Sequence, residues 1–148
     1  MIINTTNLNE VRKQIQKFKK ENSNEAIIVK AFDEEFNKKV LEIPGVKVLL
    51  APEIHNRKEP LKQRDSGLNE HLCRFAKEKN IKIAIDIGSL QKLDKKEKAM
   101  VLSRIMQNIQ LCKRTKTPIV LWPEDRYSKL DAISFITSLK GSTEMMNK

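Results

Sequence analysis

Hydrophobic and polar positions form two kinds of segment that alternate along the chain. Short runs of aliphatic and β-branched residues predict strands, and apolar residues that recur every three or four positions predict helices. The predicted strands cover residues 1–4, 26–31, 46–51, 81–88 and 118–122. The predicted helices begin at residues that can accept a hydrogen bond from a first-turn amide, or just after them: Thr6 or Asn7, Asp33, a position near Gly67, Asp94 and Ser128. Strand and helix therefore follow one another from end to end.

This alternation is typical of an α/β fold. Strands that are apolar along nearly their whole length indicate a parallel sheet covered by helices. Right-handed crossovers then allow either an open doubly wound sheet or a partial, irregular barrel, and periodicity does not choose between them. A chain of 148 residues is expected to form a single domain over residues 1–148. Residues 142–148 are expected to fray.

The balance of charge narrows the class of partner. Lys and Arg number 29 against 19 Asp and Glu, which gives a formal charge of +10 and favours polyanions. Nucleic acid, an acidic protein or an anionic membrane would each fit, and the lack of a long apolar or amphipathic anchor favours nucleic acid. The longest apolar runs fall far short of the roughly 20 residues that span a bilayer. The first residues lack the pattern of a secretory signal. We therefore expect a cytoplasmic protein with no membrane partner.

Basic residues cluster in the loop after the third predicted strand, where α/β folds place binding sites. Arg57, Lys58, Lys62 and Arg64 lie within eight residues, and Glu59 is the one acid among them. Such a run indicates contact with phosphates, although a solvated loop would look the same.

A second basic cluster, Lys113, Arg114 and Lys116, closes the longest predicted helix. Phosphate contact would explain it, and so would attraction to the negative end of the helix dipole. Arg104, Gln107 and Arg114 form a polar stripe on the same helix, with Asn108 at its edge. Planar donors of this kind suit contacts with phosphate and sugar, although a solvent-facing helix would look the same.

Signals of catalysis are weaker. His55 and His71 are the two histidines, and with Asp65, Glu70 and Asp86 they could in principle form a metal site, but their spacing matches no metal-binding motif. The sequence also has no glycine-rich phosphate loop. We therefore predict no catalytic and no metal-binding residue. Two cysteines without a second pair indicate reduced thiols in the core.

Three segments in order carry a resemblance to a known family. Residues 64–90 include Asp65-Ser66-Gly67-Leu68 at the entry to a helix, residues 101–121 pair an Arg-containing helix with a basic turn and a strand, and residues 39–54 contain the preceding strand. Together they resemble the ribonuclease P protein family that is called component 3 in archaea. The similarity covers residues 40–125 and, more loosely, residues 5–40.

The resemblance implies an irregular β/α barrel, similar to the polymerase-and-histidinol-phosphatase phosphoesterase barrels but without their metal chemistry. Asn4, Thr5 and Thr6 stand where those enzymes carry a histidine pair. The sequence is short for the family, and its loop after the fifth strand departs from the usual turn, which implies an incomplete barrel.

The resemblance also implies a function. The chain would be a non-catalytic protein subunit of ribonuclease P, the ribonucleoprotein endonuclease that removes 5′ leaders from precursor tRNA. It would bind the ribonuclease P RNA, pair with a second small ribonuclease P protein as a heterodimer, and meet precursor tRNA only indirectly. It would bind no cofactor, and magnesium would lie on the RNA.

Residue by residue, the patterns give one candidate site. Asp65 or Ser66 is expected to cap the next helix, and Gly67 is expected to let the backbone approach RNA or a partner closely. The predicted RNA-binding residues are Arg57, Lys58, Lys62, Arg64, Ser66, Gly67, Arg104, Asn108, Lys113, Arg114 and Lys116. Two other functions stay open: a metal-dependent phosphoesterase on the same barrel, and a general RNA-binding module.

Overall fold

A computed structural model describes residues 1–21 and 24–146. Its single sheet has five parallel strands in consecutive order: β1 (Ile2–Ile3), β2 (Ile27–Lys30), β3 (Val46–Leu50), β4 (Lys82–Asp86) and β5 (Ile119–Trp122). A doubly wound sheet reverses its strand order at a switch point, and this sheet does not. The α/β class predicted from the sequence is confirmed. Of the two arrangements that periodicity left open, the consecutive order is that of a partial β/α barrel.

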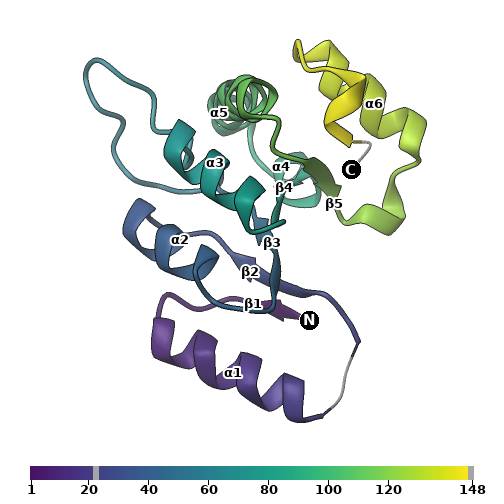
Figure 1. Cartoon of the computed structure of the whole chain (residues 1–148). Helices are drawn as coiled ribbons and strands as arrows, with labels where there is room; N and C mark the ends of the chain where they lie inside the picture. Colours follow the sequence, from purple (N-terminus) through teal and green to yellow (C-terminus); the bar gives the residue numbers. More distant parts are fainter. Residues whose placement is uncertain (22–23, 147–148) are drawn as a thin grey trace.

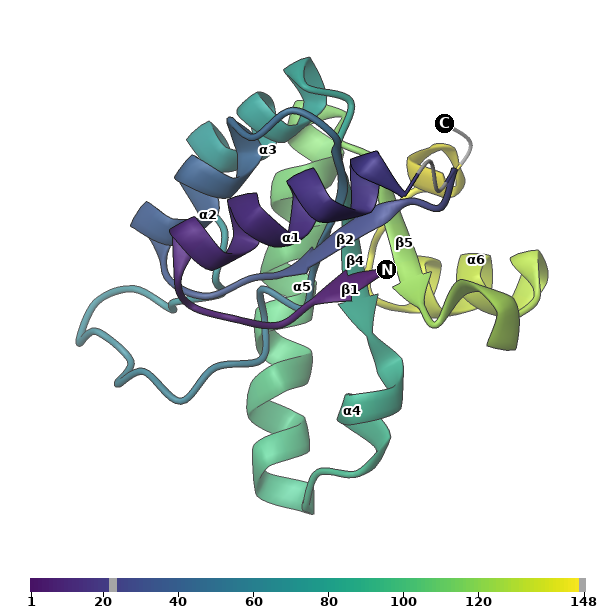
Figure 2. The same ribbon diagram turned by 90° about the horizontal axis from the view of Figure 1, so that it is seen from below.

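Helices follow the strands around the outside of the sheet (Figure 1). They are α1 (Leu8–Lys20), α2 (Glu34–Leu41), α3 (Glu70–Glu78), α4 (Ile87–Gln91), α5 (Lys95–Thr115) and α6 (Lys129–Ser138), with short 3₁₀ helices η1 (Glu124–Arg126) and η2 (Thr143–Met146). Figure 2 shows α5 continuing well beyond the end of the sheet, with α4 beside its first turns. Within the described residues, no helix is both long enough and apolar enough to cross a membrane.

Side-chain caps explain where most helices begin. Asn7, Asp33, Asp94 and Ser128 each accept a hydrogen bond from a backbone N–H in the first turn, as the sequence predicts. Helix α3 differs, because Asn69 is its cap and accepts from the Leu72 N–H at 2.8 Å. The prediction that Asp65 or Ser66 caps this helix is therefore wrong.

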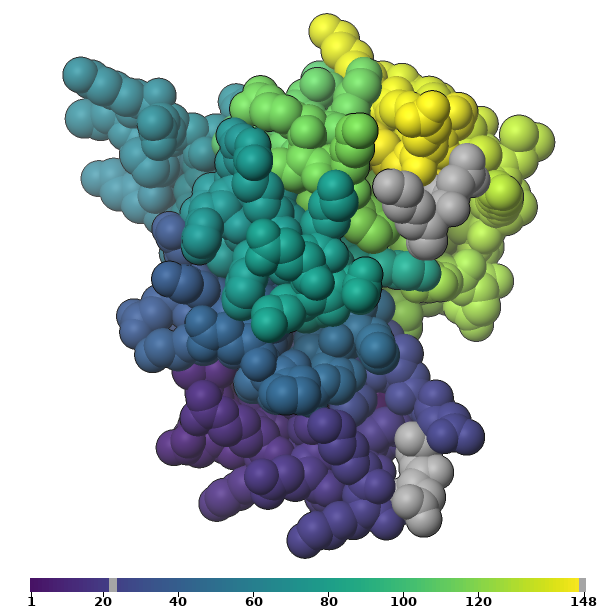
Figure 3. Space-filling model, viewed as in Figure 1, coloured from purple at the N-terminus to yellow at the C-terminus, as the bar shows by residue number. Residues whose placement is uncertain are grey.

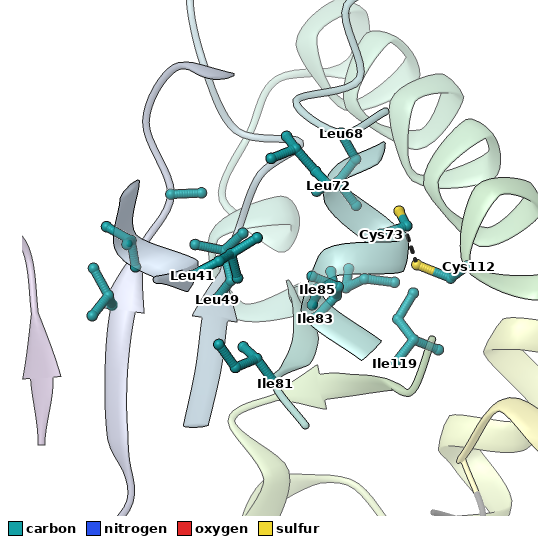
Figure 4. Packing of buried hydrophobic residues seen from close by; sticks show 14 of the residues in the cluster. Leu41, Leu49, Leu68, Leu72, Cys73, Ile81, Ile83, Ile85, Cys112 and Ile119 are labelled. Atoms are coloured by element: carbon teal, nitrogen blue, oxygen red, sulfur yellow. Dashed lines mark hydrogen bonds between the residues drawn. The ribbon is translucent and has the colours of Figure 1, made fainter. Parts of the chain in front are cut away.

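The main core lies between the sheet and the outer helices (Figure 4). Alternate strand residues such as Val29, Leu49, Ile83 and Ile119 point into it and are fully buried. On the opposite face of the sheet, Ile28, Val48, Leu50, Ala51 and Ala84 form a smaller apolar cluster. This alternation is the strand period of two that the sequence shows.

The strands are mostly one residue shorter at an end than the predicted ranges, and two differences are larger. The fourth strand ends at Asp86, not residue 88, because the Asp86 carboxylate accepts hydrogen bonds from the Ser89 N–H and hydroxyl and so begins α4. At the other end, residues 143–146 of the expected frayed tail form η2, and Met145 is buried against the core. Residues 147–148 of that tail lie outside the described residues.

The two cysteines pair α3 with α5 inside the core, as Figure 4 shows. Cys73 and Cys112 are both fully buried and free, with their Sγ atoms 4.0 Å apart. The hydrogen bond with Cys73, together with burial, raises the pKa of the Cys112 thiol well above its ordinary value. Because both thiols are fully buried, both positions are expected to be inert in the folded chain.

We therefore expect iodoacetamide to label neither cysteine in the native protein and both in guanidinium chloride. Mass spectrometry of the protein after a timed exposure measures the number of labels. Labelling of the native chain as fast as that of the unfolded chain would contradict the burial of the pair.

Candidate nucleic-acid interface

The long connection between β3 and α3, residues 51–69, leaves the sheet at its carboxyl edge, and we call it the β3–α3 loop. Ala51 turns the chain there with a positive φ of 57°, while its N–H still donates to Ala84 at 2.8 Å. Figures 1 and 3 show the middle of the loop projecting from the body of the molecule. The position of a projecting loop depends on the contacts that hold its base.

Arg104 of α5 is the main anchor of the loop. Its side chain is only 3% exposed. Its Nε donates to a Glu59 carboxylate oxygen at 2.9 Å, and its Nη1 donates to the Glu53 and His55 carbonyls at 3.2 and 2.9 Å. Charge-assisted bonds of this kind are about twice as strong as neutral ones. Arg104 therefore holds both the start and the middle of the loop.

Two further side chains of α5 hold the returning half of the loop. The Gln107 amide donates to the Arg64 carbonyl at 3.2 Å, and the buried Asn108 amide donates to the Ser66 carbonyl at 2.9 Å. These two residues and Arg104 are spaced so that they share one face of the helix. Arg104, Gln107 and Asn108 of the predicted polar stripe thus face the loop, and Arg104 and Asn108 anchor it.

Inside the loop, Arg57 pairs with Asp65. The Arg57 Nε and Nη2 donate to the two Asp65 carboxylate oxygens at 2.9 and 3.3 Å, and Nη1 donates to the Phe32 carbonyl at 2.9 Å. The hydrogen bond from Arg57 lowers the pKa of Asp65. Of the four predicted loop cations, Arg57 is therefore matched by an acid of the same loop, Asp65.

Glu59 links this pair to the anchor. Its second carboxylate oxygen accepts from the Asp65 N–H at 2.7 Å. Burial raises the pKa of Glu59, but the hydrogen bonds from Asp65 and Arg104 outweigh it and leave that pKa below its ordinary value. Glu59 is therefore an ionised bridge between α5 and the loop backbone.

His55, near the start of the loop, has a neutral side chain. Burial lowers the pKa of His55. Its Nδ1 accepts from the Arg57 N–H at 3.2 Å, so Nε2 carries the proton and donates to the Asp65 carbonyl at 2.7 Å. The His55 ring thus links the first half of the loop to its returning half.

Ser66 and Gly67 contact other residues of the same loop. Ser66 is buried, and its hydroxyl donates to the Leu68 carbonyl at 3.2 Å. Gly67 has a φ of +86°, and a Cβ placed there would lie 1.8 Å from the Pro52 carbonyl oxygen. The close backbone approach expected at Gly67 is therefore an approach to Pro52, and it requires glycine.

The other three predicted cations of the loop are exposed. Lys58, Lys62 and Arg64 are exposed, and no ion pair involves them within residues 1–21 and 24–146. Leu61 is fully exposed between them. Three of the four predicted loop cations thus face solvent on a loop whose base is fixed.

The second predicted cluster is divided by the fold. Arg114 faces α3, where its Nη1 lies 3.5 Å from Glu70. Lys113 and Lys116 instead line a hollow with Pro118, Ser142 and Glu144 beside η2. Lys116 also ends α5 in the left-handed conformation, with a φ of 58°. These three residues do not join the tip of the loop in one cluster.

The structure also contains a buried acid that the sequence analysis missed. Glu53 is fully buried, and one carboxylate oxygen accepts from the Asp86 N–H at 3.0 Å while the other has no hydrogen-bond partner. Burial raises the pKa of Glu53 to about 7. The only signal in the sequence was the position of Glu53 between Pro52 and Ile54, as a polar residue inside an apolar stretch that follows a strand.

The side chains considered for a metal site are dispersed. His55 and Asp65 lie together, but His71 stacks on Phe75, Glu70 pairs with Arg74, and Asp86 caps α4. Among the described residues, no three His, Cys, Asp or Glu side chains are grouped so that they could hold a metal ion.

Fold and site together define a class: an α/β protein with consecutive parallel strands and a basic loop anchored at their carboxyl edge. No model of a known protein family matches the chain.

Similarity to curated proteins is more specific than this class. The chain is 30% identical over 119 residues to Ribonuclease P protein component 3 of Methanococcus maripaludis (strain C6), and 31% identical over 117 residues to the protein of that name from Methanococcus vannielii. The protein of the same name from Methanocaldococcus jannaschii is 26% identical over 119 residues. These alignments cover 79–80% of this chain and 47% of each relative, so the chain spans about half the length of the curated relatives it matches. The resemblance predicted from the sequence is confirmed.

The fold has a solved counterpart as well. A chain in the cryo-EM structure of archaeal Ribonuclease P with mature tRNA superposes with a TM-score of 0.72 and 22% identity. The superposition covers 95% of this chain and 59% of that chain. It shows that the two chains share a fold.

Proposed function

We propose that this chain acts as a protein subunit of ribonuclease P and supports a catalytic RNA that removes 5′ leaders from precursor tRNA. One observation carries the proposal: the β3–α3 loop is fixed to α5 at its base and presents Lys58, Lys62 and Arg64 to solvent without a partner acid among the described residues. The names of the curated relatives support the same assignment.

The physical role follows from charge. RNA that folds into a compact state brings phosphates together, and cations of the protein reduce their repulsion. A loop with a fixed base places its cations at set positions, so less conformational entropy is lost when RNA binds. The protein would therefore favour the folded, magnesium-binding state of the RNA. In this role the chain contributes no catalytic group of its own.

Reconstitution tests the proposal. We expect the cognate RNA at low magnesium to cleave precursor tRNA only when this chain and a second small ribonuclease P protein are both added. Cleavage by protein without RNA would move the active site into this chain. No rescue by a properly assembled complex would overturn the proposed role.

A charge variant tests the loop itself. We expect the triple variant Lys58→Gln, Lys62→Gln, Arg64→Gln to bind RNA at least about ten-fold more weakly at roughly 0.1 M salt, and to reduce the slope of log affinity against log salt by about 2 to 3, because each phosphate contact releases counterions. Fluorescence anisotropy with a labelled RNA at several salt concentrations measures both quantities.

The matched control removes the same charge elsewhere. Lys13→Gln, Lys17→Gln, Lys20→Gln changes three exposed cations of α1. We expect this control to bind RNA almost as the unmodified chain does. Equal losses in the two triple variants would show that net charge, and not the loop, binds RNA.

A further inference from the structure

A cavity lies beside the base of the β3–α3 loop, at the carboxyl ends of β1, β2 and β3. Its volume is about 750 Å³, within the range of about 300–1,000 Å³ that is usual for small-molecule sites. Three segments distant in sequence enclose it: residues 4–6 after β1, residues 30–32 at the end of β2, and residues 54–59 of the loop. The first half of α5 closes the remaining side. The fold therefore forms a concave site at the edge of the sheet.

The wall of the cavity is apolar and includes a partly exposed aromatic ring. Phe32 is 45% exposed and Met100 is 43% exposed, although both are large apolar side chains. Ile54, Leu93 and Val101 complete this wall. An exposed apolar surface inside a concave site is typical of ligand sites, because a ligand removes it from water.

Phe32 is held firmly in this position. Its N–H donates to the buried Asn37 side chain at 2.8 Å, and its carbonyl accepts from Arg57 at 2.9 Å. Its ring meets Phe36 edge-on, with the ring centroids 6.0 Å apart. Two hydrogen bonds therefore fix the Phe32 backbone, and the ring packs against Phe36 while part of its surface stays open to solvent.

The polar part of the cavity is positively charged. Four basic side chains line it against two acidic ones, Glu59 and Glu97. Arg57 and Arg104 are engaged by Asp65 and Glu59. Lys30 and Lys58 have no ion pair in the part of the chain that the structure describes. The cavity thus combines an aromatic surface with two available cations.

We propose that this cavity holds one unpaired nucleotide of an RNA chain, with its base on Phe32 and its phosphate near Lys30 and Lys58. The proposal rests on the proposed RNA-binding function and names the part of the RNA that this cavity recognises. A base has a flat apolar face that can stack on an aromatic ring, and the phosphate beside it is anionic. The polar side chains of Asn4, Thr5 and Thr6 also line the cavity and suit ribose hydroxyls or base edges. A base inside a duplex is already stacked and paired, so it cannot enter.

Binding of single-stranded and duplex RNA tests the proposal. The probe is a single-stranded RNA of about twelve nucleotides with 2-aminopurine at a central position, and the same strand paired with its complement. We expect the fluorescence of 2-aminopurine to change when the single strand binds, and to stay unchanged when the duplex binds.

Two variants locate the effect. Phe32→Leu keeps an apolar side chain and removes the ring, and we expect it to bind the single strand about ten-fold more weakly, since stacking on an aromatic side chain is a major contribution per base. Its affinity for the duplex should stay unchanged, which also shows that the variant is folded. Lys30→Gln should lower the salt slope for the single strand by about 0.7. Phe135→Leu on α6 is the matched control, because the same substitution there lies outside the cavity.

The outcomes separate the two proposals. If the unmodified chain binds neither RNA, the proposed function and the nucleotide site both fail. If RNA binding depends on the loop cations but Phe32→Leu leaves single-strand affinity and fluorescence unchanged, only the nucleotide site is overturned. That second result would leave the cavity as a surface for something other than a base, such as a partner protein.

Discussion

Replacing Arg104 with Met is expected to lower the free energy of unfolding by about 2–3 kcal/mol, since hydrogen bonds to charged groups typically contribute about 1.5–3 kcal/mol and the Glu59 side chain left behind is 32% exposed. The physical reason is the set of groups that Arg104 leaves behind. The Glu59 carboxylate and the carbonyls of Glu53 and His55 all lose the hydrogen bonds that Arg104 donates. Urea unfolding followed by circular dichroism measures the change.

A control on the same helix distinguishes burial from charge. Arg114→Met removes an arginine whose side chain is 64% exposed, and we expect a change within about 0.5 kcal/mol. Adding Glu59→Gln to Arg104→Met removes the unpaired carboxylate, so the double variant should recover part of the lost stability. Equal effects of Arg104→Met and Arg114→Met would contradict the anchoring role.

Arg104→Met also distinguishes an anchoring role from direct contact with RNA. Because Arg104 fixes the loop that carries the exposed cations, Arg104→Met should weaken RNA binding together with stability. A variant with unchanged stability and weaker RNA binding would instead favour the direct contact predicted from the sequence.

Replacing Glu53 with Gln is expected to stabilise the chain above neutral pH and to have little effect in acid. Burial raises the pKa of Glu53 from its ordinary value of 4.5 to about 7. Between these two values the folded chain holds a proton that the unfolded chain has released, so the free energy of unfolding falls as pH rises through this range. The stabilising contribution is fully present below pH 4.5 and is lost above pH 7. This shift in the pKa of Glu53 corresponds to a loss of about 3 kcal/mol in the free energy of unfolding between pH 4.5 and pH 7.

Glutamine keeps the acceptor for the Asp86 N–H and cannot ionise, so it removes this pH dependence. We expect Glu53→Gln to be more stable than the unmodified chain by about 3 kcal/mol at pH 8.5 and nearly equal to it at pH 4.5. Chemical unfolding at these two pH values measures the difference. Glu42→Gln, at an exposed carboxyl, is the control and should have the same small effect at both. A Glu53→Gln variant that is less stable at high pH would show that the buried carboxylate has a partner in solution.

The sequence predicted most of the fold because the signals are local. Apolar runs such as residues 26–31 and 46–51 fix the strands, and caps such as Asn7, Asp33 and Asp94 fix the helix starts. The α3 cap was missed because Asp65, Ser66 and Asn69 are all capable of capping. Asn69 is the cap. The Asp65 carboxylate instead accepts from Arg57 and the Gly67 N–H, and the Ser66 hydroxyl donates to the Leu68 carbonyl.

The candidate site was only partly predictable. Lys58, Lys62 and Arg64 were identified by charge density, and the structure leaves them exposed. Arg104, Asn108 and Ser66 were chosen with them because a polar side chain looks the same in sequence whether it faces solvent or another segment. Phe32 was missed because a single aromatic residue after a strand carries no sign that a cavity will form beside it.

By itself, the sequence determined the α/β class, the order of the elements, the basic character of the β3–α3 loop and the resemblance to component 3, since each depends on residue types and their spacing along the chain. The tertiary structure alone decided which polar residues are interior. It turned Arg104, Gln107 and Asn108 toward the loop, buried Glu53, and brought Lys30 and Phe32 into one cavity with Lys58. The physical reason is that these pairings join residues tens of positions apart, and only the packing of strands and helices brings such residues together.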